Sequence, residues 1–387
     1  MRTAALVVTT TLFLAAVPSQ RAEIVFARVW PNAGQVGLFV ADADGSNEHP
    51  LLGLGQIDYD PVWAPDGGSI VFTSDREGSA DLFRVKPDGT GLERLTDSPA
   101  YDDQAAFSPD GKQLVFVTTR NGGTADLWTM DLQTKKGKAL TSGPGGDFRP
   151  SWSPDGKWIA FSSDRGSTMP MGRGRWEHLQ LADIYLVRPD GSGLKRITTP
   201  GNFCGSPKFS ADGARLVAYC MDAQDTLEIR RPNPRPENEL DTRATLDTRL
   251  VSIDIATGAM SDIQAGPGAK FNPSFLPGDA VGYVRKDLPD AGIYYTGGRK
   301  GPKGDVRAAA WSPDGKRIAF HRRLAAPPTN WLKTFSRNPQ FDLTLSGILP
   351  SFNATGDKFV ITGRPVAPPL GATLQIIKAG TNKADVI

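Results

Sequence analysis

The sequence has little of what most catalytic and metal sites are built from. Its 387 residues include two cysteines and three histidines, and His49, His178 and His321 fall in unrelated parts of the chain. No G-x-S-x-G, H-E-x-x-H, P-loop or C-x-x-C motif occurs. These absences argue against the common hydrolase, zinc-peptidase and nucleotide-binding sites. We therefore expect a binding module without a cofactor rather than an enzyme, and we assign no catalytic residue and no metal ligands.

Charge of one sign and long apolar runs are also scarce. The formal net charge is +2, and no long basic run suggests a nucleic-acid partner. The one long apolar run, 4–17, follows Arg2 and is too short to span a bilayer. It predicts a signal peptide at 1–19, although a first β-strand or a short core helix would also suit it. We expect a periplasmic or extracellular protein, with no transmembrane segment after signal removal.

What the chain has in abundance is short strands and tight turns. In the stretch Pro61–Thr96, apolar and β-branched runs alternate with Pro, Asp and Gly, which favour turns. The pattern predicts four short antiparallel strands, at 62–63, 70–72, 82–85 and 92–96. One such sheet cannot bury both of its faces, so it needs neighbours of the same kind.

Those neighbours are present. An aromatic residue followed by a turn such as Ser-Pro-Asp-Gly begins each of seven copies. The seven aromatic heads are Trp63, Phe107, Trp152, Phe209, Phe275, Trp311 and Phe352. A base period of about 40–45 residues with four strands per unit is typical of a β-propeller, an all-β fold of four-stranded antiparallel blades.

The full pattern, W-S-P-D-G-K-x-I-A-F, S-D-R, D-L-Y, D-G-S-G-L and L-T, resembles the WD40-like propeller repeat of the TolB family. The resemblance covers nearly the whole chain after the apolar run. It implies an envelope or periplasmic propeller that binds a protein or peptide partner. TolB proteins carry an α/β domain before the propeller, whereas here repeat strands directly follow the predicted signal.

The repeat count predicts one domain over 20–387. Residues 24–28 and 37–40 match the second and third strands of a repeat whose inner strand is missing. Seven heads and this incomplete unit predict seven or eight blades. We expect either a chain truncated at its C-terminus or an eighth, three-stranded blade.

Three longer stretches interrupt the repeats, at 166–181, 222–247 and 321–340. Each falls between a second and a third strand, so all three should lie on one face of the disc. Trp176 and Trp331 are candidate aromatic anchors for a ligand on that face. Tolerated surface loops are the alternative interpretation.

One position varies around the ring. Five residues before the head, the first three repeats carry Asp58, Asp102 and Asp147, and Asp60 and Asp103 lie beside them. The later repeats carry Cys204, Lys270, Val306 and Gly347 instead. Like charges at a channel mouth attract a cation or a basic group, so we predict that these aspartates bind a basic peptide segment or a metal ion. A hydrated channel without a ligand is the alternative.

Other repeated residues have a structural interpretation, because every blade needs the same turn. These are the Asp of Ser-Pro-Asp-Gly and the pairs Asp75–Arg76 and Asp164–Arg165. Cys204 and Cys220 are symmetric about the turn at Asp212, so a hairpin centred there would make them cross-strand neighbours. We predict a disulfide, with two buried thiols as the alternative.

Two further functions remain open. The chain could be the propeller domain of a larger peptidase-like protein. It could also be a propeller lyase that acts on acidic oligosaccharides, and a cluster of His, Arg and metal in the channel would favour that reading.

Overall fold

The computed structural model describes two compact units of the chain. Contacts group residues 31–326 into one unit and residues 1–30 with 327–387 into the other. The described residues are 24–27, 36–54, 56–167, 181–199, 201, 203–221, 247–286, 290–323, 332–335, 348–352, 358–363, 373–378 and 384–386. They contain no helix with the length and apolar character needed to cross a membrane. The signal peptide at 1–19 and the domain boundaries at 20–387 stay predictions.

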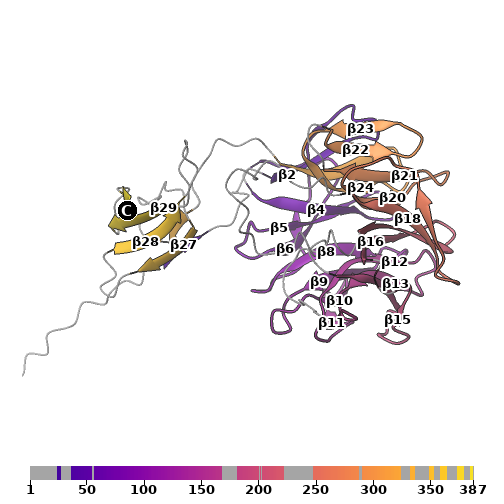
Figure 1. Cartoon of the computed structure of the whole chain (residues 1–387), viewed down its shortest axis with the longest axis horizontal. Coiled ribbons are helices and arrows are strands. Elements are labelled where there is room, and N and C mark those ends of the chain that lie inside the picture. Colours follow the sequence, from indigo (N-terminus) through magenta and orange to yellow (C-terminus); the bar gives the residue numbers. More distant parts are fainter. Residues whose placement is uncertain are drawn as a thin grey trace, which may run out of the picture. The chain divides into compact units, whose positions relative to one another are not determined.

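The larger unit contains six four-stranded antiparallel sheets, which are the blades of a propeller (Figure 1). Blades one to three use consecutive strands: β4 (Asp58–Trp63), β5 (Ile70–Ser74), β6 (Asp81–Val85) and β7 (Glu93–Arg94); β8 (Asp102–Phe107), β9 (Gln113–Thr118), β10 (Asp126–Asp131) and β11 (Gly137–Ala139); β12 (Asp147–Trp152), β13 (Ile159–Ser163), β14 (Asp183–Val187) and β15 (Lys195–Arg196). Blades four and five follow: β16 (Phe203–Phe209), β17 (Arg215–Met221), β18 (Arg249–Asp254) and β19 (Met260–Ile263); β20 (Lys270–Phe275), β21 (Val281–Arg285), β22 (Gly292–Tyr295) and β23 (Lys300–Lys303).

Blade six closes the ring with strands from both parts of the sequence. Its inner strands are β24 (Val306–Trp311) and β25 (Arg317–Arg323), and its outer strands are β2 (Val36–Asp42) and β3 (His49–Pro50). Figure 1 shows the indigo strand β2 among the orange strands of the last blades. The inner strand β24 also contacts β4 of the first blade. The ring therefore has six blades, and the prediction of seven or eight was wrong.

The physical reason for the error is that two incomplete units form one blade. The N-terminal unit without an inner strand completes the repeat that begins at Trp311. Residues 321–340 are therefore not an insertion within a blade, because the strand that follows β25 in its sheet is β2. The predicted third strand at 37–40 is confirmed, since it lies within β2.

The smaller unit contains the rest of the described strands. A two-stranded antiparallel ribbon joins β1 (Ile24–Ala27) to β26 (Leu332–Phe335), so 24–28 is not the blade strand that we expected. The seventh head, Phe352, ends β27 (Ile348–Phe352) in a sheet with β28 (Lys358–Gly363), β29 (Thr373–Lys378) and β30 (Ala384–Val386).

The hydrophobic core of the larger unit lies between blades rather than within them. Each of its six clusters joins residues of two neighbouring sheets; one combines Leu38 and Val40 of blade six with Ile70 and Phe72 of blade one. The heads join these clusters as predicted: Trp63 and Phe107 are buried, and the other four are partly buried. Burying a large side chain stabilises the fold by about 1.5–3 kcal/mol, so each blade depends on its neighbours.

The Ser-Pro-Asp-Gly turns form the face of the disc where the inner strands end, here called the turn face. In the third blade the Ser153 hydroxyl donates to Asp155 at 2.7 Å and accepts from the Trp158 amide at 2.9 Å. The hydrogen bond from Ser153 is the main cause that lowers the pKa of Asp155 to about 2. Gly156 has a φ of 71°, which favours glycine. The recurrent Asp therefore has the structural role that we inferred.

Candidate functional site

A β-bulge interrupts the inner strand of every blade. In each case the residue three positions before the head has a positive φ, between 47° and 54°, although none is glycine. These six bulge residues are Asp60, Gln104, Arg149, Ser206, Asn272 and Ala308. A left-handed backbone in non-glycine residues costs about 1–3 kcal/mol and concentrates at functional sites, and a bulge re-aims the side chain that it carries. The sheet scaffold is repeated, but the side chain presented by each bulge is different.

Two of the bulge residues meet across the ring. Asp60 of blade one and Arg149 of blade three form an ion pair at 3.0 Å, although blade two stands between them in the ring. The side chain of Gln104, in blade two, accepts a hydrogen bond from the Arg149 amide at 2.9 Å. Such contacts are possible only near the axis, where the inner strands converge. Asp60, Gln104 and Arg149 therefore bond to one another in one half of the ring, while the bulge residues of the other half are the uncharged Ser206, Asn272 and Ala308.

His321 lies at the same place. Its Nδ1 accepts the Asp60 amide at 3.3 Å, and its ring meets Tyr59 edge-on. The pKa of His321 is lowered to about 4, mainly by burial and also by the nearby cations Arg307, Arg149 and Lys286, while the charge of Asp60 acts in the opposite direction. Burial, with the charge of Asp60 added, raises the pKa of the buried Asp103 well above its usual range. Because the pKa of His321 is about 4, its imidazole is uncharged at neutral pH.

The predicted acidic arc lies where the inner strands begin, on the face opposite the turns. We call this the mouth face. Each arc carboxylate accepts a hydrogen bond from the Nη2 of an arginine that lies 18 residues later in the chain. The distances are 2.9 Å for Arg76 to Asp58, 2.6 Å for Arg120 to Asp102 and 2.5 Å for Arg165 to Asp147. The arginine Nε donates to a hydroxyl at the end of the second strand, on Ser74, Thr118 or Ser163. We call this threefold arrangement the arginine clasp.

The clasp buries the acids and leaves the cations at the surface. The side chains of Asp58, Asp102 and Asp147 are 0–2% exposed, whereas those of Arg76, Arg120 and Arg165 are 14–27% exposed. Burial raises the pKa of Asp58 and of Asp147, against the lowering effect of their arginines. Oδ1 of Asp102 and of Asp147 is buried without a hydrogen bond to a described residue. Binding of a cation by the arc stays a prediction, and no group of three His, Cys, Asp or Glu arranged for a metal occurs in the described part.

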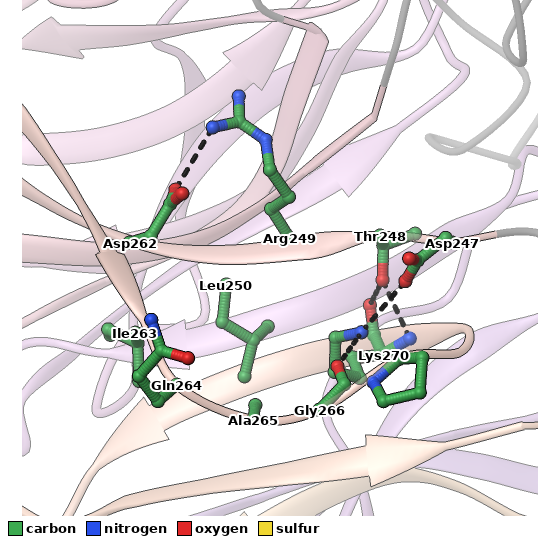
Figure 2. A pocket seen from close by; sticks show the side chains of 11 residues that line it. Asp247, Thr248, Arg249, Leu250, Asp262, Ile263, Gln264, Ala265, Gly266 and Lys270 are labelled. Atoms are coloured by element: carbon green, nitrogen blue, oxygen red, sulfur yellow. Dashed lines mark hydrogen bonds and ion pairs between the residues drawn. The ribbon is translucent and has the colours of Figure 1, made fainter.

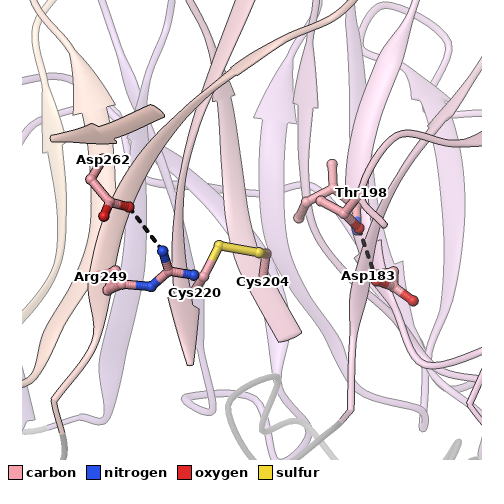
Figure 3. The surroundings of a disulfide bond; sticks show 7 residues. Asp183, Thr198, Cys204, Cys220, Arg249 and Asp262 are labelled. Atoms are coloured by element: carbon pink, nitrogen blue, oxygen red, sulfur yellow. Dashed lines mark hydrogen bonds and ion pairs between the residues drawn. A yellow bond between two sulfur atoms is a disulfide. The ribbon is translucent and has the colours of Figure 1, made fainter. Parts of the chain in front are cut away.

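Blade four replaces the clasp by a covalent bond. Cys204 and Cys220 occupy the paired positions of Asp147 and Ser163, and they form a disulfide, as the hairpin symmetry predicts. Figure 3 shows the bond between two neighbouring strands, with the Arg249–Asp262 pair on one side of it. Both cysteines are buried. In blade four an uncharged covalent bond thus joins the first two strands at the position where the clasp joins them in blade three.

Blades five and six differ again. Lys270 takes the arc position in blade five, and its Nζ donates to the carbonyls of Gly266 and Gly268 at 2.8 and 2.7 Å and to Asp247 at 3.1 Å. Figure 2 shows the bonds of Lys270 to Gly266 and Asp247, and Arg249 and Asp262 at the other end of the same group of residues. These residues line a pocket of about 240 Å³. In blade six Val306 is buried and opposes Arg322. The ring therefore has an ionic half and a mixed half.

The other predicted site residues lie elsewhere. Trp176 and Trp331 fall outside the described residues, as do most of 166–181 and 222–247. Asp60 lies close to Asp103 and to His321, and no sequence pattern had indicated that His321 lies at the axis. The bulge residues Gln104, Arg149, Ser206, Asn272 and Ala308 were missed. The sequence signal that could have found them is the position three residues before each head, which carries a different residue in all six blades.

Comparison with known proteins agrees with this geometry. A family model described as "TolB beta propeller domain" matches residues 22–122 and 101–249. The chain belongs to this family.

Individual relatives are distant. A "Protein TolB homolog" of Chlorobium luteolum is 33% identical over 39% of this chain and 31% of its own length. A "Tol-Pal system protein TolB" of Francisella tularensis subsp. mediasiatica is 27% identical over 64% of this chain and 50% of its own length. The chain thus spans at most about half of these relatives. The crystal structure of TolB from Acinetobacter baumannii matches with a TM-score of 0.50 and 20% identity, over 75% of this chain and 64% of that one, which supports the fold alone.

Proposed function

We propose that this protein is an exported TolB-type propeller that binds a partner protein at its mouth face and has no chemistry of its own. The observation that carries the proposal is that the six bulge residues at the axis differ in every blade, and that two of them, Arg149 and Asn272, are partly exposed. Uniform strands with variable, strained positions are typical of a recognition surface rather than of a purely structural ring. The name of the Francisella relative, a protein of the Tol-Pal system, fits an envelope partner.

Site-specific photocrosslinking tests this proposal. A photoreactive phenylalanine replaces Arg307, whose side chain is 30% exposed at the start of β24, or Lys316, which is exposed on the turn face. Each variant is incubated with envelope extract of the source cells and irradiated. We expect a discrete protein adduct from position 307 that is absent from position 316. Equal adducts from both positions, or adducts from position 316 alone, would contradict the proposal.

A lyase acting on acidic oligosaccharides is the second candidate, and one observation favours it. His321 is uncharged at neutral pH and has Arg149 and Arg307 nearby, so an imidazole lies beside groups that could hold a carboxylate; it could act as a base once its Nδ1 no longer accepts from the Asp60 amide. In such an elimination the base removes the proton next to the sugar carboxylate, the glycosidic C–O bond breaks and a C=C bond forms. The test is the ultraviolet absorbance of that double bond after incubation with oligogalacturonate and a divalent cation. No increase over a His321→Gln control excludes this function.

A further inference from the structure

The clasp arginines are held as rigid donors on the mouth face. Two edges of each guanidinium are fixed, Nε by a hydroxyl and Nη2 by a buried carboxylate. Each guanidinium carbon also lies 4.4–5.7 Å from the centroids of two aromatic rings. The remaining nitrogen, Nη1, makes no hydrogen bond to any residue that the structure describes. Donors fixed in this way lose little entropy when they bind a ligand.

Other cations lie near the mouth, on blades three, five and six. Arg307 is 30% exposed, Arg149 is 25% exposed, and Lys286 lies 3.9 Å from the centre of the Phe271 ring. Carboxylates offset part of this charge, since Asp60 pairs with Arg149 at 3.0 Å and Asp305 pairs with Arg307 at 2.8 Å and with Arg323 at 3.6 Å. A ligand that reaches the arc positions meets the clasp arginines first, because the acids of the arc lie beneath them.

We propose that the mouth face binds an acidic segment of a partner protein, with its carboxylates against the Nη1 edges of Arg76, Arg120 and Arg165. The inference rests on the proposed function and reverses the ligand charge that the acidic arc suggests in the sequence. Arginine binds carboxylates through charge-assisted hydrogen bonds, which are about twice as strong as neutral ones. Three consecutive blades repeat the same donor, which suits successive acidic side chains of an extended segment.

A protein segment fits this surface better than an acidic sugar. Five of the six rings beneath the guanidinium groups are 0–7% exposed, and Trp128 is partly buried; the five are Phe72, Phe83, Phe116, Phe161 and Tyr185. These five offer no flat apolar surface on which a sugar ring could lie. Recognition on this face therefore comes mainly from charge and hydrogen bonds, which carboxylate side chains and peptide carbonyls both supply.

The test uses the full chain and a fluorescent peptide of alternating Glu and Gly, with a Gln-Gly peptide as the neutral control. Anisotropy titrations give Kd, and we expect the Glu peptide to bind at least about tenfold more tightly than the Gln peptide and to weaken as salt rises. A triple variant, Arg76→Lys with Arg120→Lys and Arg165→Lys, keeps the net charge and the partner for each buried Asp but removes the Nη1 edge. We expect it to weaken Glu-peptide binding by about tenfold.

The control variant, Lys112→Gln with Lys316→Gln, removes two exposed charges from the turn face and should change Kd by less than about twofold. If the triple variant unfolds, the single variant Arg120→Lys, at the most exposed clasp, should still weaken binding by about threefold. Unchanged binding in a folded variant overturns the inference. So does tighter binding of oligogalacturonate that is lost in the same variant, because the ligand would then be a sugar.

This inference can fail separately from the proposed function. A protein adduct at position 307 without affinity for the Glu peptide would overturn the acidic ligand but keep the partner-binding role. The loss of both signals would overturn both.

Discussion

Blades one to three and blades four to six share a scaffold but are fastened differently at the mouth face. In the first three blades a buried aspartate is paired with an arginine from the same blade, and the bulge residues Asp60, Gln104 and Arg149 bond to one another. In the other three, the equivalent position is a disulfide, a buried lysine or a valine, and the bulge residues are uncharged. The repeat therefore tolerates several local solutions as long as each buried group has a partner.

The comparison also explains why one half suits recognition. A clasp leaves an arginine edge at the surface, whereas the disulfide and the buried Lys270 leave no comparable donor at their positions. Buried ion pairs contribute little net stability compared with apolar substitutes. The clasps are thus poorly explained by stability alone, which is consistent with a role at the surface.

The largest effect is expected from breaking one clasp. Arg165→Met keeps much of the apolar stem but leaves the buried Asp147 without its cation. We expect the free energy of unfolding at pH 7 to fall by about 3–5 kcal/mol, because an uncompensated buried charge is costly. Denaturant unfolding measures it. The matched control is Arg215→Met at an exposed ion pair with Asp279, which should cost less than about 1 kcal/mol. Equal losses would mean that the clasp is no more than a surface pair.

The disulfide should contribute somewhat less. Its cysteines are 16 residues apart, so Cys204→Ala with Cys220→Ala should lower the free energy of unfolding by about 3 kcal/mol through loop entropy. Thermal unfolding of the oxidised parent and of the variant measures the difference. Two titratable thiols in denatured, non-reduced parent protein would show that the bond does not form in the exported chain.

Exchanging the two fastenings is a sharper test with a smaller expected effect. Asp147 opposes Ser163 in the same register as Cys204 and Cys220, so Asp147→Cys with Ser163→Cys and Arg165→Met should form a second disulfide. Replacing a buried ion pair by an uncharged substitute is often neutral, so oxidised protein should remain within about 2 kcal/mol of the parent. Mass spectrometry detects the bond. Failure to oxidise would show that equal register does not give equal geometry.

The smallest effect concerns pH at the axis. The folded pKa of His321, about 4, lies below its unfolded value of about 6.5, so the native state binds fewer protons between these values. The parent should therefore lose stability relative to His321→Gln as pH falls from 6.5 to 4. The full pKa difference corresponds to about 3 kcal/mol, but His321 is partly exposed, so we expect a loss of about 1–2 kcal/mol. The buried Asp126, whose pKa burial raises to about 6, should have the opposite sign. As pH falls from 6 to 4, the native state binds more protons than the unfolded state, so the parent should gain stability relative to Asp126→Asn. Identical pH profiles for parent and variants would contradict both assignments.

Local chemistry made much of the fold predictable from the sequence. The turn of Ser153, Pro154, Asp155 and Gly156 satisfies its own hydrogen bonds, so its recurrence identified the inner strands, their heads and the face opposite the mouth. The symmetry of Cys204 and Cys220 about one turn placed them opposite each other, because antiparallel pairing in a hairpin is set by the turn. The same symmetry applied to Asp58 would have placed it opposite Ser74 and beside Arg76.

Only the tertiary structure decided the rest, because it depends on residues far apart in the chain. Ring closure joins Val36–Asp42 to Arg317–Arg323, and no local pattern says which repeat the N-terminal strands complete. The contacts of Asp60 with Arg149 and His321 require the whole ring to bring three blades to one axis. The charge at the surface of the mouth could likewise not be predicted from Asp58, Asp102 and Asp147 in the sequence. Folding buried those carboxylates beneath arginines, because a buried charge is stable only with a partner.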